Sequence, residues 1–227
     1  MTFKEFTKEL NGSRVEGELL KSILYSLLVS FGLFAILYIV TLRYIDNFIP
    51  KYGFYIFFAI LSYAIIFPAI KQIRAYGRFA CMSGMMIGMT AGMMSGFLSG
   101  FFIGATNGMF YGLVFGMAVG IFMGVWTGKS CGIMGIMEGL MGGFMAGAMG
   151  AMTSVMLLND HLKFASVIIF VICAVIMFSL NYMIYLEMKE NKREVKESHW
   201  VVVLLSFILT GITIWLMVFG PRSALFV

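Results

Sequence analysis

Residues 80–105 read ACMSGMMIGMTAGMMSGFLSGFFIGA, and this stretch decides the class of fold. It carries no charged side chain, and as one helix it is long enough to cross the roughly 30 Å of hydrocarbon in a bilayer. Of the 227 residues, 61% are hydrophobic and 12% are charged, whereas a soluble domain is about half apolar and a quarter charged. A water-soluble fold of this length could not bury so much apolar surface. The sequence therefore predicts an all-α, polytopic transmembrane bundle.

Seven apolar stretches have about the length of a transmembrane helix. We expect the spans at 22–42, 53–71, 80–105, 108–127, 131–158, 164–186 and 199–219. A single helix over 80–127 would be about 70 Å long, twice the thickness of a bilayer core. We therefore place a tight turn at Thr106–Asn107–Gly108, with a re-entrant break at that point as the alternative.

The basic residues predict the orientation of the chain in the membrane. With the N-terminus inside, the inner segments hold twelve Lys and Arg residues and the outer segments hold four, and cytoplasmic loops carry such an excess. We expect seven spans in the plasma membrane, N-in and C-out. The predicted parts are a cytoplasmic amphipathic segment at 1–21, one bundle at 22–219 with a Gly/Met-rich core at 80–158, and a tail at 220–227.

Glycine recurs at every fourth position from Gly84 to Gly132, and a second series runs from Gly135 to Gly147. Small residues four apart let helix backbones approach closely in lipid, where packing drives association. We expect glycine-zipper packing among the three central spans, or against copies of the chain. The packing residues predicted are Gly84, Gly88, Gly92, Gly96, Gly100, Gly104, Gly135, Gly139, Gly143 and Gly147.

Sixteen of the 21 methionines lie between Met82 and Met156. At 100° per residue, most methionines of span 131–158 fall on one face with Glu138, and the glycines fall on another. Thioethers are soft ligands suited to Cu(I), and they are also flexible fillers of irregular gaps. The candidate metal residues are Met134, Glu138, Met141, Met145, Met149, Met152, Met156, Cys81, Cys131, Met85, Met89, Met93, Asp160 and His161.

The candidate path runs from Asp160 and His161 at one end of the bundle, along the methionines, to Cys131 and Cys81 at the other. Each end has a plainer interpretation, because cysteines often pack as small apolar residues and Asp160 and His161 also fit a solvated loop. Glu138 is the strongest functional candidate, since an ionisable group inside a span is expensive. The alternative is a structural glutamate paired with Lys129.

The runs Met85–Met89–Met93 and Met141–Met145–Met149, beside glycines four apart, resemble the motif pair of eukaryotic high-affinity copper transporters. The resemblance is local to two spans. Those transporters have three spans and a methionine-rich outer tail, whereas seven spans and no such tail are expected here. The resemblance implies shared soft-metal chemistry without family membership.

We expect a transporter, channel or holder of a soft monovalent metal ion, with Cu(I) as the cargo. One alternative is a non-catalytic assembly subunit that packs on a partner membrane subunit or in a homo-oligomer through its glycines, and another is a proton-coupled channel for a small solute that uses Glu138. Residues 124–130, GVWTGKS, have three residues between the glycines where a phosphate-binding loop has four, so no nucleotide is expected. We expect the lipid bilayer as partner, no nucleic acid, and no enzymatic activity, because no nucleophile–base motif is visible.

Overall fold

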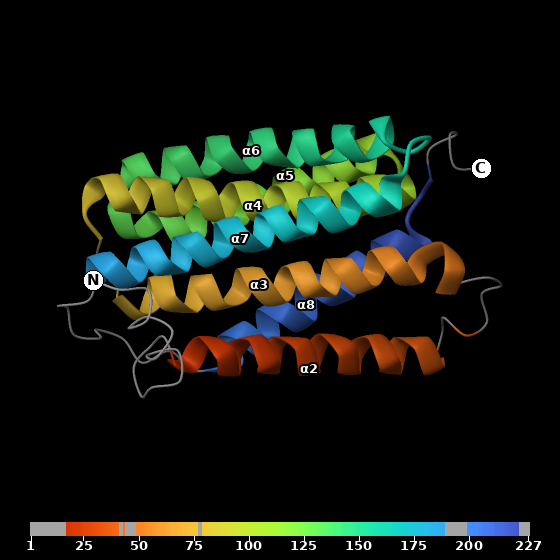
Figure 1. Ribbon diagram of the computed structural model, residues 1–227, viewed down its shortest axis with the longest axis horizontal. Coiled ribbons are helices and arrows are strands. Elements are labelled where there is room, and N and C mark those ends of the chain that lie inside the picture. The colour runs from red at the N-terminus through yellow and green to blue at the C-terminus, as the bar shows by residue number, and fades with distance from the viewer. Residues whose placement is uncertain (1–16, 41–42, 44–48, 77–78, 189–198, 223–227) are drawn as a thin grey trace.

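The computed structural model describes residues 17–40, 43, 49–76, 79–188 and 199–222. Within these residues the chain is helical and forms no strand, and seven helices are long and apolar enough to cross a membrane. They are α2 (Gly17–Val40), α3 (Phe54–Tyr76), α4 (Cys81–Asn107), α5 (Met109–Gly128), α6 (Ile133–Met156), α7 (Leu162–Met188) and α8 (His199–Phe219), shown in Figure 1. The predicted all-helical class is confirmed, and the seven helices fit a multi-pass membrane protein.

The break expected at 106–108 is a tight turn between two helices. Helix α4 ends at Asn107 and α5 begins at Met109. Gly108 between them has a φ of 107°, a conformation that glycine adopts without the steric penalty of a side chain. Most of the amphipathic segment predicted at 1–21 lies outside the described residues, as does the tail beyond residue 222.

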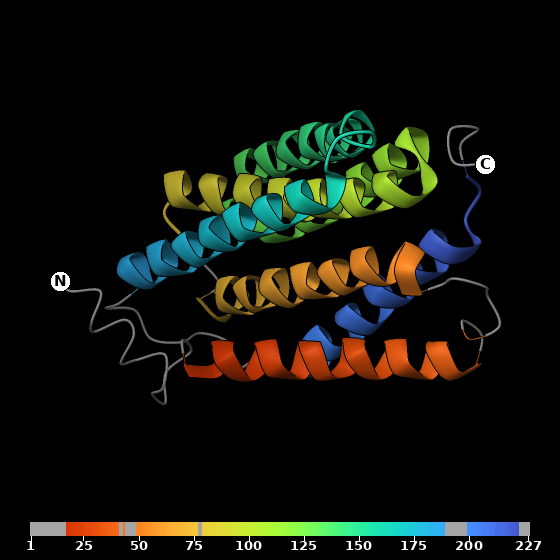
Figure 2. The same cartoon turned by 45° about the vertical axis from the view of Figure 1, so that its right-hand side comes forward.

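The helices form two groups, which Figures 1 and 2 show from two directions. Helices α4, α5 and α6 pack closely together, and α2, α3 and α8 form the second group. Helix α3 contacts α2, α4, α7 and α8, so it connects the two groups. The largest buried side chains come from α3 and from the second half of α4, and they include Tyr63, Phe67, Phe101 and Phe102. A short helical turn, η2 (Ile49–Gly53), precedes α3.

The glycines of α4 lie directly against the backbones of α5 and α6. A Cβ atom added to Gly92 would lie 2.9 Å from the Gly139 carbonyl oxygen and 3.0 Å from the Gly124 Cα. The same contact repeats at four-residue steps, with Gly88 between Gly128 and Gly135, Gly96 between Gly120 and Gly143, and Gly100 between Gly112 and Gly147. From Gly88 to Gly100 the contacted glycines fall in number along α5 and rise along α6. Helix α4 is therefore antiparallel to α5 and parallel to α6. Three backbones therefore meet with no room for side chains.

The regular four-residue spacing of the glycines is interrupted at the connection from α5 to α6. A 3₁₀ turn, η3 (Lys129–Cys131), follows α5, and Gly132 after it has a φ of 75°. The chain reverses here, and α6 begins a new helical phase at Ile133. For this reason the glycine spacing of four changes to three between Gly132 and Gly135.

Hydroxyl groups hold α2 against α8. Ser30 Oγ lies 2.8 Å from Ser206 Oγ and 3.1 Å from Thr210 Oγ1, and Ser26 Oγ lies 3.1 Å from Ser206 Oγ. All four side chains are buried. Hydrogen bonds between helices contribute about 0.6 kcal/mol each in membrane proteins, so this cluster stabilises the pairing of two predominantly apolar helices.

We expect Ser206→Ala to lower the free energy of unfolding by about 1 kcal/mol, because it removes two hydrogen bonds between helices. Unfolding of the purified protein in detergent micelles measures this change. Ser166→Ala is the matched control, since Ser166 is also buried but donates only to the Leu162 carbonyl oxygen of its own helix. Equal losses for the two variants would contradict the assigned role of Ser206.

Candidate functional site

The methionine stripe of α6 lies on the surface of the described helices. Exposure of its side chains ranges from 41% at Met152 to 75% at Met156. We use the term methionine surface for the exposed methionines of α4 and α6, which are Met82, Met86, Met89, Met134, Met137, Met141, Met145, Met149, Met152 and Met156. The glycines of α6 face the opposite way and are buried. The thioethers therefore follow the outside of the three-helix group.

The methionines of α4 and α6 lie side by side at Gly142. A Cβ atom at Gly142 would lie 3.0 Å from Met93 Cγ and 3.3 Å from Met89 Cγ. The absence of a side chain at Gly142 thus makes room for two thioether side chains of the neighbouring helix. Met85, also predicted as a ligand, is half-buried near the start of α4.

A hollow of about 320 Å³ lies where α4, α6 and α7 meet. Four of its lining residues carry sulfur, and the others are hydrocarbon. They are Met93, Met94, Met149, Cys173, Phe97, Ala146, Ile169, Ile172 and Ile176. We call this space the sulfur-lined hollow. Cys173 is 6% exposed, so its thiol group belongs to the interior of the bundle.

The sulfur-lined hollow offers donors of one chemical kind. Three thioethers and one thiol are soft ligands, suited to Cu(I) or Ag(I) and poorly suited to Mg²⁺ or Ca²⁺, which take oxygen ligands. A cation in an apolar space needs a compensating charge. The Cys173 thiol can supply that charge by releasing its proton, so that one monovalent ion and one thiolate form a neutral unit.

The sequence predicts two of the four sulfur-containing residues of the hollow as metal ligands. Met93 and Met149 belong to the predicted set, whereas Met94 and Cys173 do not. Cys173 has no local signal, because it stands in an ordinary stretch of Ile, Val and Phe on α7. Only the packing of α7 against α4 brings Cys173 to a hollow that Met93, Met94 and Met149 also line.

Cys81 and Cys131 meet at one end of the bundle. Cys131 Sγ donates a hydrogen bond to the Cys81 carbonyl oxygen at 2.8 Å, and the two thiol groups are close enough to interact. Gly84 provides the space, since a Cβ there would lie 3.1 Å from Cys131 Sγ. Both cysteines are free thiols; Cys81 is the first residue of α4, and Cys131 is the last residue of the turn η3, just before α6. The sequence predicts both cysteines at the same end of the candidate path, and the structure brings them into contact there.

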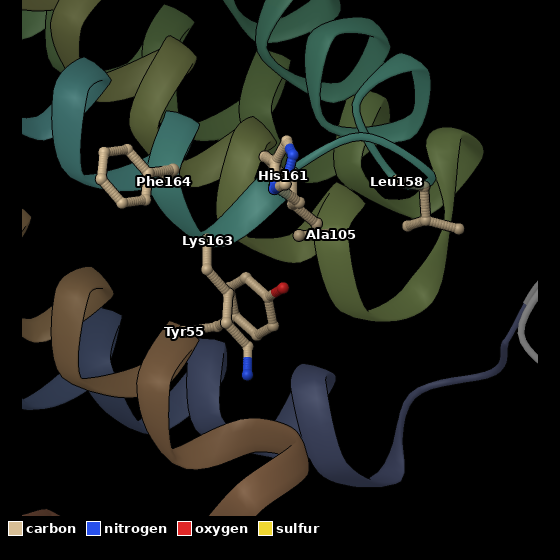
Figure 3. Close-up of a pocket in the computed structure, with 7 residues that line it drawn as sticks. Tyr55, Ala105, Leu158, His161, Lys163 and Phe164 are labelled. Atoms are coloured by element: carbon tan, nitrogen blue, oxygen red, sulfur yellow. The ribbon is translucent and has the colours of Figure 1, made fainter.

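Asp160 and His161 lie at the opposite end, in the turn between α6 and α7. His161 has a φ of 38°, uncommon for a residue other than glycine. It borders a hollow of about 390 Å³ with Tyr55 and Lys163, shown in Figure 3, and one of about 560 Å³ with Asp160. Since α6 is about 36 Å long, these residues and the two cysteines cannot bind one ion together. Among the described residues, no three His, Cys, Asp or Glu side chains form a metal-binding group.

Glu138 is half-buried in the second turn of α6, on the side of the methionine surface. Within the described residues its carboxylate has no hydrogen bond or ion pair, and the alternative pairing with Lys129 is not formed there. A carboxylate at this position in a span is costly to expose to lipid. Glu138 therefore calls for a partner group, a proton or a bound cation.

A scan against protein-family models found no match for this chain, and searches of curated proteins and of solved structures found no similar protein.

Proposed function

We propose that this protein holds or moves a soft monovalent metal ion across a membrane, with Cu(I) as the cargo. The observation that supports this proposal most is the sulfur-lined hollow, where Cys173 and three methionines from three helices surround one apolar space. A transporter for a hard cation would need oxygen ligands in that place. Cu(I) with one thiolate and thioethers carries no net charge and is compatible with the hydrocarbon around it.

The methionine surface and the two ends of the bundle suit the approach and exit of such an ion. Exposed thioethers follow α6 over its whole length and pass the hollow at Met149. Conduction requires several weak sites from which an ion can leave. Thioethers without charge provide weak sites where a second copy of the chain or a partner subunit covers the methionine surface and keeps the ion from lipid. We place the binding of the ion at one end of the bundle on the thiols of Cys81 and Cys131, and at the other end on Asp160 and His161.

The proposal is tested by measuring which metal ions the purified full-length protein binds. We expect Ag(I) and Cu(I) to bind at micromolar concentration or tighter, with release of about one proton per ion because a thiol must lose its proton to bind. Zn²⁺ and Mg²⁺ are the controls and should compete weakly. Equal binding of all four ions, or binding of none, would contradict the proposal.

The second candidate is a non-catalytic assembly subunit. Its support is the same methionine surface, because flexible methionines are common at surfaces that bind several partners, and a partner helix there would also cover Glu138. The central glycines are engaged within the chain, so a partner would bind an exposed apolar face, of which the methionine surface is one. A partner membrane protein that co-purifies, together with no Ag(I) binding, would favour this function over transport.

A proton-coupled solute channel is the third candidate, and Glu138 alone supports it. Flux that depends on pH and on Glu138, but on no methionine or cysteine, would distinguish this function from metal transport.

A further inference from the structure

A shallow groove follows one face of α5. Its lining residues are Ala118, Ile121, Phe122, Val125, Trp126 and Lys129, and its volume is about 530 Å³. These positions repeat at spacings of three and four, so they form one continuous stripe along the helix. From Ala118 to Lys129 the stripe is about 16 Å long, which is half of the hydrocarbon thickness of a bilayer. This is the depth that one acyl chain occupies in one leaflet.

The groove is apolar along its length and basic at one end. Lys129 is exposed at the end of α5, in the turn η3. The Arg74 guanidinium group of α3 lies 5.1 Å from the centre of the Trp126 ring, which is a cation–π distance. Helices α3 and α5 contain no Asp or Glu.

We propose that this groove binds an anionic phospholipid, with one acyl chain along α5 and the phosphate group near Lys129 and Arg74. The length of the groove fits an acyl chain in one leaflet, and the charge at its end is complementary to a phosphate group. Trp126 lies where aromatic side chains meet lipid headgroups. This binding is independent of the metal proposal, since it uses another face of the three-helix group and none of the sulfur ligands.

Thermal unfolding of the full-length protein in detergent tests this inference with three additives. They are dioleoyl phosphatidylglycerol, dioleoyl phosphatidylcholine, which has the same acyl chains, and glycerol 3-phosphate, which has no acyl chain. We expect phosphatidylglycerol to raise Tm by several degrees more than phosphatidylcholine, and glycerol 3-phosphate to have little effect. Equal shifts with the two lipids would overturn the proposal, and so would an equal shift with glycerol 3-phosphate.

Two variants locate the site. Lys129→Gln should reduce the phosphatidylglycerol retained per chain at least threefold, measured by native mass spectrometry, and Ala118→Phe should do the same by filling the groove with the charge intact. Lys163→Gln is the matched control, because Lys163 is also exposed but lies at the other end of the bundle. If Lys163→Gln reduces retention as much as Lys129→Gln, general attraction to basic residues explains the binding and the proposal is wrong.

Discussion

Gly120→Ala is expected to destabilise the protein by about 2 kcal/mol, and Gly120→Leu to prevent folding. A Cβ atom at Gly120 would lie 2.8 Å from the Gly143 carbonyl oxygen and 2.8 Å from the Gly96 Cα. Both contacts are with backbone atoms of other helices, so a side chain can enter only if two helices move apart. Adding a methyl group to a well-packed core costs about 1–3 kcal/mol. Unfolding in detergent micelles measures the loss.

Gly32→Ala is the matched control for this prediction. Gly32 lies in α2, and an added Cβ would have no atom within 4 Å. Alanine is a better helix former than glycine by up to about 1 kcal/mol, so this variant should be as stable as the wild type or slightly more stable. Equal stability of the Gly120→Ala and Gly32→Ala variants would show that the three backbones do not meet as described.

Cys173→Ser is expected to weaken Ag(I) binding more than tenfold, and Met149→Leu to weaken it severalfold. The serine variant removes the thiolate whose charge compensates the ion, and a hydroxyl group does not ionise in its place. The leucine variant removes one thioether from the sulfur-lined hollow with little change in volume. Titration of the purified variants with Ag(I), with a competing thioether ligand in solution, measures both changes.

Met134→Leu is the control on the same helix. Met134 is 62% exposed near the start of α6 and does not line the sulfur-lined hollow. Its replacement should leave the tightest binding step unchanged. If Met134→Leu and Met149→Leu weaken binding equally, the stripe binds the ion without a preferred position and the hollow is not the site.

The helices could be predicted from the sequence because their signals are local. Length and hydropathy located seven spans, and Thr106–Asn107–Gly108 marked the turn that separates α4 from α5. The predicted span 53–71 ends five residues before the end of helix α3. The helix continues to Tyr76, and Lys71 is only 2% exposed. Lys71 is therefore an interior residue of the helix, and a basic residue in the sequence does not by itself mark a helix end.

The candidate site could be predicted only in part. A helical wheel of α6 separates methionine from glycine, but it does not tell which neighbour lies beside the methionines. The methionines of that face are exposed, and among them only Met149 borders the sulfur-lined hollow, to which α7 contributes Cys173. The predicted topology places Cys81 and Cys131 at the same end, but their contact depends on the close approach of Gly84 of α4 to Cys131, which the sequence does not show. The orientation in the membrane and the role of Glu138 stay predictions.

The central claim is that the sulfur-lined hollow is a soft-metal site, and X-ray absorption at the copper edge tests it most directly. The sample is the protein with Cys81→Ser and Cys131→Ser, which removes the other two thiols, loaded with one equivalent of Cu(I), beside a variant of it that adds Cys173→Ser and Met149→Leu. We predict a first coordination shell of sulfur alone in the protein that keeps Cys173 and Met149, and the loss of that shell in the variant that lacks them. A shell that contains nitrogen or oxygen in the former, or an unchanged sulfur shell in the latter, would contradict the account.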